Sequence, residues 1–232
     1  MAEGAGCPGV EELVESLRGD PGIEVSTETI VDPPSRFSEW PLPIDMWPLY
    51  RLLVESGWRP RLVILRPGSI DAVRRIIEEA YSRGVCILVR GGRSNVVGAL
   101  VPRRCCVGLD LVRMNRILEF NPGDGYIHVE AGIRLSDLES WLNERGYTSL
   151  YYPQSLGLAT LGGSIAMLGS GAYMPGRGNI EDLIQWIDVV LPDGTHARLG
   201  SKENPRGWVG PGVKHLFIGS EGGLGIVVAA GL

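Results

Sequence analysis

Hydrophobic residues recur along the chain at two spacings, one typical of helices and the other typical of strands. Helical spacing occurs in residues 10–18, where the pattern ends at Gly19. It occurs again after the Pro-Gly-Ser sequence at residues 67–69. The apolar face of this second helix is expected to consist of Ala72, Val73, Ile76, Ile77 and Ala80.

Two short apolar runs flank the second helix, RLVIL at residues 61–65 and VCILV at residues 85–89. They predict a β-α-β unit whose two strands form a parallel pair. Later runs are separated by turn sequences such as Asn-Pro-Gly at residues 121–123, which is typical of antiparallel sheet. The strands expected there are CVGLDL at 106–111, YIHVEAG at 126–132 and WIDVVLP at 186–192.

One helix is predicted among these later strands. It should begin with a capping box formed by Ser136 and Glu139 and should end at Gly146. Its inward face is expected to carry Leu138, Trp141 and Leu142.

The pattern as a whole predicts an α+β fold of two subdomains with a ligand between them. The smaller, β-α-β subdomain is expected at residues 60–104, and the larger, mostly antiparallel one at residues 105–232. Residues 1–59 should form the first helix and then an irregular segment rich in Pro and Trp. In that segment Trp40, Trp47 and Trp58 either fill gaps beneath loops or dock to a further domain.

Three glycine-rich segments follow in order: VRGGRSN at 89–95, TLGGSIA at 160–166 and GSEGGLGIV at 219–227. Glycine lets backbone approach a ligand closely. Because the first segment follows an apolar strand, its amide groups can form a nest for a diphosphate, which points to a bound dinucleotide. The segment is neither a Rossmann fingerprint nor a P-loop, since it lacks G-x-G-x-x-G and a following lysine.

The ordered set resembles the FAD-linked oxidases of the vanillyl-alcohol oxidase and p-cresol methylhydroxylase (PCMH) superfamily. It most resembles the branch of glycolate oxidase, D-lactate dehydrogenase and alkyldihydroxyacetonephosphate synthase. The resemblance covers residues 60–232 and is carried by RGGRSNVVGALVP (90–102), LDLVRMNRIL (109–118), HVEAG (128–132), ATLGGSIA (159–166), GNIEDLI (178–184), VVLPDG (189–194) and LFIGSEGGLGI (216–226).

This resemblance implies a PCMH-type fold that holds FAD between its two subdomains. It places the pyrophosphate at residues 91–95, the flavin against residues 154–160 and 167–170, and the adenosine side against residues 221–227. The cofactor-binding residues expected on this basis are Val89, Arg90, Gly91, Gly92, Arg93, Ser94, Asn95, Gln154, Ser155, Thr160, Gly162, Gly163, Met167, Gly169, Ser170, Glu221, Gly222, Gly225, Ile226 and Val227.

The sequence departs from the family at several positions. Arg93 stands where the family usually has a third glycine, and Gly223 where it usually has threonine. Arg93 either adds a charge-assisted bond to the phosphate or, pointing inward, blocks the cofactor. Many relatives tether FAD through a histidine in the first glycine loop, whereas this loop has none, so non-covalent FAD is expected. Arg177, which replaces a tyrosine common in relatives, either approaches the substrate or lies at the surface.

Composition narrows the remaining functions. A formal net charge of -5 argues against nucleic-acid binding, which needs a basic surface. The 4 cysteines lack metal-ligand spacing, so buried free thiols are expected, with Cys86 and the adjacent Cys105 and Cys106 in strands. Residues 147–176 carry no charge, but their Gly, Pro and polar residues favour a wall around an uncharged aromatic ligand over a membrane helix. The start of the chain has no signal-peptide pattern, which favours a cytoplasmic location.

Three functions remain open from the sequence. The first is the FAD-binding domain of an oxidoreductase, of the 2-hydroxy-acid (glycolate or D-lactate) type or the alkyldihydroxyacetonephosphate synthase type. The second is a FAD-binding subunit or fragment that has no turnover by itself. In relatives a following cap domain carries the catalytic groups, so this chain would need a cap-bearing or electron-transfer partner for catalysis. The third is a degenerate fold that binds nothing. The catalytic residues, substrate and electron acceptor are not identified by the sequence.

Overall fold

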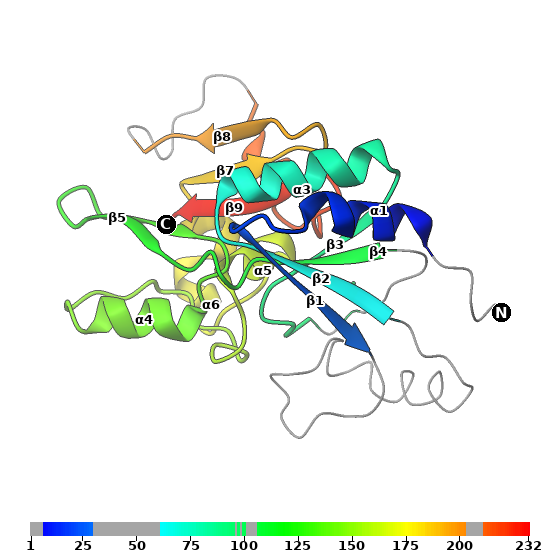
Figure 1. Cartoon of the computed structure of the whole chain (residues 1–232). Helices are drawn as coiled ribbons and strands as arrows, with labels where there is room; N and C mark the ends of the chain where they lie inside the picture. Colours follow the sequence, from blue (N-terminus) through cyan, green and yellow to red (C-terminus); the bar gives the residue numbers. More distant parts are fainter. Residues whose placement is uncertain (1–6, 30–60, 96, 98, 101–105, 203–210) are drawn as a thin grey trace.

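The protein contains two β-sheets joined by a common core, with helices α1 and α3 lying together over one of them (Figure 1). The computed structural model describes residues 7–29, 61–95, 97, 99–100, 106–202 and 211–232. The predicted Pro- and Trp-rich segment, with Trp40, Trp47 and Trp58, lies outside these residues. The described part confirms the α+β class expected from the sequence.

The first sheet has four strands in the order β1-β2-β4-β3. Strand β1 runs antiparallel to β2, whereas β2, β4 and β3 are parallel to one another. Helices α1 and α3 contact each other, and α3 also contacts β2 and β3. The elements are α1 (Pro8–Leu17), β1 (Ile23–Thr29), β2 (Arg61–Pro67), α3 (Ile70–Ser82), β3 (Cys86–Arg90) and β4 (Cys106–Asp110).

The place of β4 corrects two predictions. The two strands of the β-α-β unit are parallel but are not a pair, because β4 lies between them. Strand β4 was expected among the antiparallel strands, yet it belongs to the first sheet. A short, continuous apolar run fits a buried strand in either sheet, so its local pattern does not select its partners. The sequence analysis also missed β1, whose polar residues Glu24, Ser26 and Thr27 hid a strand at the edge of the sheet.

The second sheet is antiparallel throughout, as predicted, with the order β5-β6-β9-β7-β8. Its central strand, β9, comes last in the chain, which places the third glycine segment beside the middle of the sheet. The remaining elements are β5 (Ile117–Asn121), β6 (Tyr126–Glu130), α4 (Leu135–Asn143), α5 (Leu161–Ala166), α6 (Met174–Arg177), α7 (Ile180–Leu183), β7 (Trp186–Val190), β8 (His196–Gly200), α8 (Lys214–Phe217) and β9 (Ile226–Gly231).

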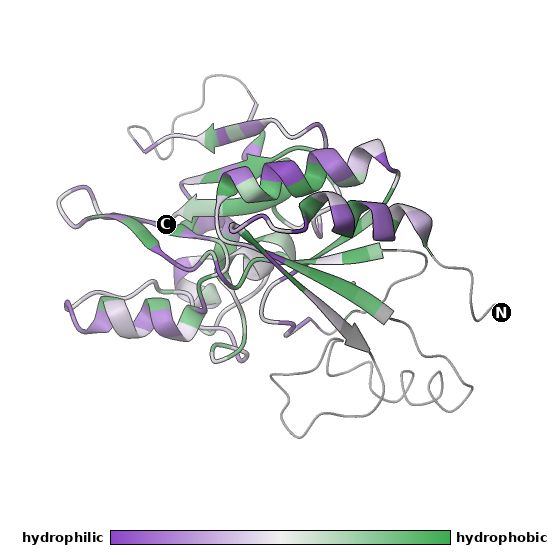
Figure 2. Cartoon of the chain, in the orientation of Figure 1, coloured by the Kyte–Doolittle hydropathy of each residue, from purple (hydrophilic) through white to green (hydrophobic). Residues whose placement is uncertain are grey.

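The two N-terminal helices form where the hydrophobic pattern predicted them. Helix α3 starts at Ser69, whose side chain accepts a hydrogen bond from the amide of Ala72. The five residues of its predicted apolar face are all buried, and Figure 2 shows the alternation of polar and apolar residues along α1 and α3. Among the described helices, none is long and apolar enough to cross a membrane.

Helix α4 lacks the predicted capping box. Its N-cap is Arg134, and Ser136 already lies within the helix. The carboxylate of Glu139 instead accepts hydrogen bonds from Ser149, at 2.7 Å from the hydroxyl and 3.1 Å from the amide, and a further bond from the Thr148 hydroxyl. Glu139 therefore ties the loop after the helix back onto the helix, a partnership that local spacing does not show.

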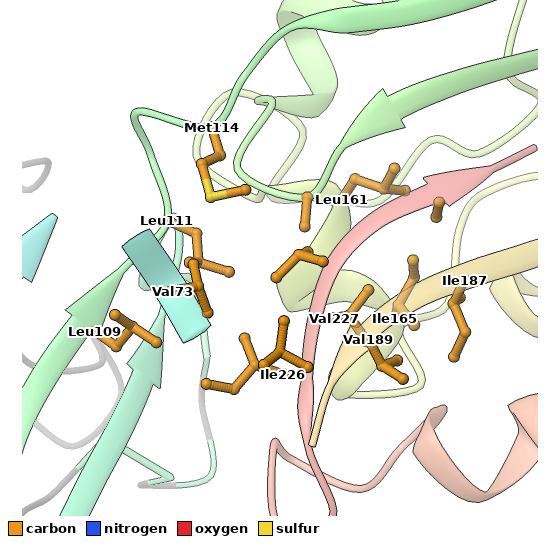
Figure 3. Packing of buried hydrophobic residues seen from close by; sticks show 14 of the residues in the cluster. Val73, Leu109, Leu111, Met114, Leu161, Ile165, Ile187, Val189, Ile226 and Val227 are labelled. Carbon is orange, nitrogen blue, oxygen red and sulfur yellow. The ribbon is translucent and has the colours of Figure 1, made fainter. Parts of the chain in front are cut away.

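A single apolar cluster joins the two sheets. It includes Val73 of α3, Leu109 of β4, Val189 of β7 and Val227 of β9, all buried. Figure 3 shows these residues packed in the space between the two sheets. Because both sheets bury their inner faces in one core, the two subdomains are held in a fixed relation to each other.

The cysteines correct another expectation. Cys86 and Cys106 are paired in the parallel register of β3 and β4 and form a disulfide, and Cys7 is also disulfide-bonded. The prediction of free thiols for Cys86 and Cys106 was wrong because the bond depends on the register of two strands 20 residues apart. Cys105 lies outside the described residues.

A buried polar network crosses the second sheet. The carboxylate of Asp188 lies 2.8 Å from Nε2 of His128 and accepts bonds of 2.7 and 2.9 Å from Arg198. Burial alone would raise the pKa of Asp188, but the hydrogen bonds and charges of His128 and Arg198 outweigh it, so the pKa lies below its ordinary value. His128 is thus held in the second sheet by its contact with Asp188.

We expect acid to destabilise the protein partly through Asp188. Because its folded pKa is lowered, its contribution to stability is present above the unfolded pKa of about 3.9 and is lost as the pH falls through the lower folded value. Asp188→Asn should lower the free energy of unfolding at neutral pH by about 1.5–3 kcal/mol, the range for hydrogen bonds to charged groups. Denaturant unfolding between neutral pH and about pH 3 should show the difference between the variant and the parent shrinking below about pH 4. Asp124→Asn, at an exposed turn, serves as control, and a constant difference across this pH range would contradict the assignment.

Candidate functional site

Two adjoining cavities lie between the glycine-rich segments. The first, of about 200 Å³, is lined by the end of β3 and the loop after it, by α5 and by residues 217–227. The second, of about 670 Å³, is lined by residues 151–155 and by the stretch from Gly163 to Ala172. The cavities share Ser94, Asn95, Gly163 and Met167, so together they form one elongated site.

The structure brings together all the residues that the sequence analysis expected to bind the cofactor. The first cavity is lined by Val89, Arg90, Gly91, Gly92, Arg93, Ser94, Asn95, Thr160, Gly162, Gly163, Met167, Glu221, Gly222, Gly225, Ile226 and Val227. Gln154, Ser155, Gly169 and Ser170 line the second cavity. Three segments far apart in the sequence therefore converge on one site.

The loop after β3 presents backbone donors to the first cavity. Within the described part of the chain, the amides of Gly91, Gly92, Ser94 and Asn95 donate no hydrogen bond to a protein acceptor. Unpaired amides that line a cavity require an acceptor from a ligand or from water. Successive amides of this kind suit the oxygens of a diphosphate.

The start of this loop is fixed by a buried ion pair. Nε of Arg90 lies 3.1 Å from a carboxylate oxygen of Asp110, and the two residues are 4% and 3% exposed. They are also register partners at the ends of β3 and β4, and the Arg90 carbonyl accepts a bond of 3.2 Å from the Leu111 amide. Asp110 therefore holds the last residue of β3 in place where the loop leaves the sheet.

The glycines of the loop are required by contact with protein. A methyl group on Gly91 would overlap the Thr160 hydroxyl, and one on Gly92 would overlap the Leu158 carbonyl. In the same way, a methyl group on Gly162 would overlap Ala131. The sequence analysis explained these glycines by approach to a ligand, but the structure assigns their space to the packing of the first segment on the second.

The second cavity is lined without any charged side chain among the described residues. Its wall includes Tyr151, whose pKa is raised because burial disfavours the phenolate, although a hydrogen bond with the Ser164 side chain opposes the shift. The lining is thus uncharged, as is the stretch of residues 147–176 to which most of it belongs, and its role as a wall around an aromatic ligand stays a prediction. The site list from the sequence omitted Tyr151, Tyr152 and Ala172, although all three fall in that uncharged stretch.

The two arginines left open by the sequence have different surroundings. Arg93 lines the first cavity and adopts a positive φ of 59°, a conformation that favours glycine. Arg177 is exposed on α6 and lines neither cavity. The described residues that line the two cavities include no histidine and no lysine.

Comparison with known proteins identifies the family. Residues 61–200, more than half of the 232-residue chain, match the family model described as FAD binding domain. The chain belongs to this family. Its fold matches a solved alkyldihydroxyacetonephosphate synthase with a TM-score of 0.76 and 28% identity, over 95% of this chain and 39% of that one. A 4-ethylphenol oxidase from Gulosibacter chungangensis, at 26% identity, matches with a TM-score of 0.61 over 73% of this chain and 34% of its own. The expected PCMH-type fold is thereby confirmed.

Several curated relatives are similar in sequence. Alkyldihydroxyacetonephosphate synthase of Dictyostelium discoideum is 35% identical over 74% of this chain and 28% of its own length. D-2-hydroxyglutarate dehydrogenase of Xanthomonas citri pv. viticola is 33% identical over 75% of this chain and 37% of its own. The FAD-linked oxidoreductase YgcU of Escherichia coli K12 is 31% identical over 93% of this chain and 42% of its own. The chain therefore spans roughly a third of the length of these relatives, and the part that it shares with them includes the FAD binding domain.

The packing of Gly92 on Leu158 predicts that this glycine cannot be replaced without loss of stability. Gly92→Ala should lower the free energy of unfolding by about 1–3 kcal/mol, because the added methyl group forces backbone apart. Gly157→Ala is the matched control in the facing loop, where a methyl group meets no atom within 4 Å. Denaturant unfolding of both variants measures the difference, and equal stability of the two would show that the loops are not in contact.

Proposed function

We propose that the chain binds FAD non-covalently along both cavities. The diphosphate lies at the amides of residues 91–95, and the isoalloxazine lies in the uncharged cavity. The observation that carries the proposal is that four unpaired loop amides line a cavity continuous with one that has no charged lining. The first cavity offers amide hydrogen-bond donors for an anion, which suits the diphosphate. The second offers polar backbone and aromatic side chains, which suit the isoalloxazine.

Bound FAD supplies a two-electron acceptor, and the protein supplies position and surroundings. The loop amides would bind the diphosphate, with Arg90 and Asp110 holding the start of the loop. Tyr151 and the backbone near Gly169 would form the wall at the flavin end. His128 lies in the second sheet, bound to Asp188, and takes no part in the lining.

We propose that the reaction is oxidation of a 2-hydroxy acid. The sequence similarity to the D-2-hydroxyglutarate dehydrogenases supports this choice. The similarity to the alkyldihydroxyacetonephosphate synthases supports the second candidate, which is synthesis of an alkyldihydroxyacetonephosphate. The described residues that line the cavities include no histidine and no lysine. The groups that bind and deprotonate the substrate would therefore come from residues outside the described part, either in a longer chain or in a partner that covers the flavin.

Binding and its non-covalent nature are tested together. Titration of the flavin-free chain with FAD should raise its unfolding temperature, and FAD at about a hundredfold above its Kd should add about 2.7 kcal/mol of stability. Acid precipitation should then leave all the yellow colour in the supernatant. Flavin that stays on the precipitated chain would contradict the non-covalent assignment, and a chain that FAD does not stabilise would contradict FAD binding.

Arg93 is proposed to contact the diphosphate. Arg93→Ala should weaken FAD binding by about 1.5–3 kcal/mol, the range for a hydrogen bond involving charge, with a greater loss at low salt. Arg177→Ala removes an exposed arginine that lines neither cavity and should leave the Kd unchanged. Kd values come from FAD fluorescence titrations at two salt concentrations. Tighter binding by Arg93→Ala would show that the side chain obstructs the site.

The FAD-loaded chain alone should not oxidise 2-hydroxy acids at an ordinary enzymatic rate of about 1–10 per second. Catalysis needs a base within reach of the substrate hydroxyl, and the described cavity linings do not provide a histidine or lysine for that role. Dye reduction with D-2-hydroxyglutarate, D-lactate and glycolate measures the rate. A 2-hydroxy acid that supports rapid turnover would show that the chain carries its own catalytic groups.

A further inference from the structure

A side-chain contact joins two glycine-rich segments where the two cavities meet. Nδ2 of Asn95 lies 3.2 Å from Sδ of Met167 and donates a hydrogen bond to this sulfur. Asn95 belongs to the loop after β3, and Met167 is the C-cap residue of α5. The contact therefore links the loop of the first sheet to the helix beside the second.

The other atoms of the Asn95 side chain are also engaged. Its Oδ1 accepts hydrogen bonds from the amides of Val97, at 3.1 Å, and Ala99, at 3.2 Å. These bonds fold the loop back on its own side chain and fix the orientation of the amide group. The Nδ2 donor is consequently aimed at Met167 by local structure.

Helix α5 is itself held firmly on its other side. The carbonyls of Ile165 and Ala166 accept backbone hydrogen bonds of 3.0 and 2.9 Å from Gly219 and Glu221 of the third glycine segment. Met167 thus follows a helix that is hydrogen-bonded to the third glycine segment, whereas Asn95 is part of the first. Their contact completes a ring of the three segments around the site.

The position of the contact matters because Asn95 and Met167 line both cavities. A ligand that fills the two cavities has to pass these residues, with one end on each side. We propose that the Asn95–Met167 contact is a latch that retains FAD by closing the middle of the site. This inference rests on the proposed FAD function and adds a residue pair that controls how fast the cofactor is released.

The sulfur of Met167 is the part of the latch that can be changed with least disturbance. Met167→Leu keeps an apolar side chain of similar volume but removes the acceptor. Met167→Gln keeps an unbranched side chain and offers an amide oxygen, a stronger acceptor than a thioether. Met174→Leu makes the same replacement at an exposed methionine that lines neither cavity and serves as control.

The test measures the rate of FAD release from each loaded variant, by dilution into an excess of a different flavin-free flavoprotein that traps the released cofactor. Met167→Leu should release FAD about three- to tenfold faster than the parent, as the loss of one hydrogen bond predicts. Met167→Gln should release it more slowly than Met167→Leu, and Met174→Leu should match the parent.

Equal release rates for Met167→Leu, Met167→Gln and the parent would overturn the latch while leaving FAD binding intact. The latch would also fail if Met167→Leu and Met167→Gln accelerated release equally, because that result would reflect packing alone. Thermal unfolding of the flavin-free variants shows whether they are folded. Failure of the parent chain to bind FAD would overturn the proposed function itself, so the two failures are distinct.

Discussion

The close approach of two backbone segments, Gly91–Gly92 and Leu158–Thr160, governs how the site is built. Side chains larger than hydrogen at either glycine would overlap atoms of the facing segment. The loop also lines the first cavity, and among the described residues the amides of Gly91, Gly92, Ser94 and Asn95 have no protein acceptor. The same two glycines therefore join the two subdomains and leave the loop's donors for a ligand.

The core and the cavity share residues, so stability and binding are linked. Leu111, Ile226 and Val227 belong to the apolar cluster between the sheets and also line the first cavity (Figure 3). A ligand that contacts these side chains therefore contacts the same residues that pack one sheet against the other. A ligand that binds the folded chain at these residues would therefore stabilise the packing between the sheets.

The sequence predicted the parts of the structure that depend on local pattern or on the order of motifs. The buried face of α3 follows from helical spacing alone. The order of the three glycine segments pointed to one shared site, and all three line the first cavity. Local pattern did not predict the partners of β4, the Cys86–Cys106 disulfide or the hydrogen bonds that Glu139 accepts from the loop at Ser149. Each of these depends on which distant residues the fold brings together. The Asn95–Met167 contact was missed for the same reason, although both residues were on the predicted site list.

The distribution of charge along the site bears on the direction in which we propose that FAD binds. Among the described residues, the charged ones that line the two cavities are Arg90, Arg93 and Glu221. All three belong to the first cavity, and Arg90 is paired with Asp110. A diphosphate placed in the second cavity would lose water without gaining a cation from the described lining, which also lacks Gly91 and Gly92, and this loss is costly for a charged group. An isoalloxazine placed there loses little, because its ring system is uncharged and the lining offers aromatic and small polar groups. The arrangement of charges therefore supports the proposed orientation of FAD, with its flavin end toward Tyr151 and Tyr152.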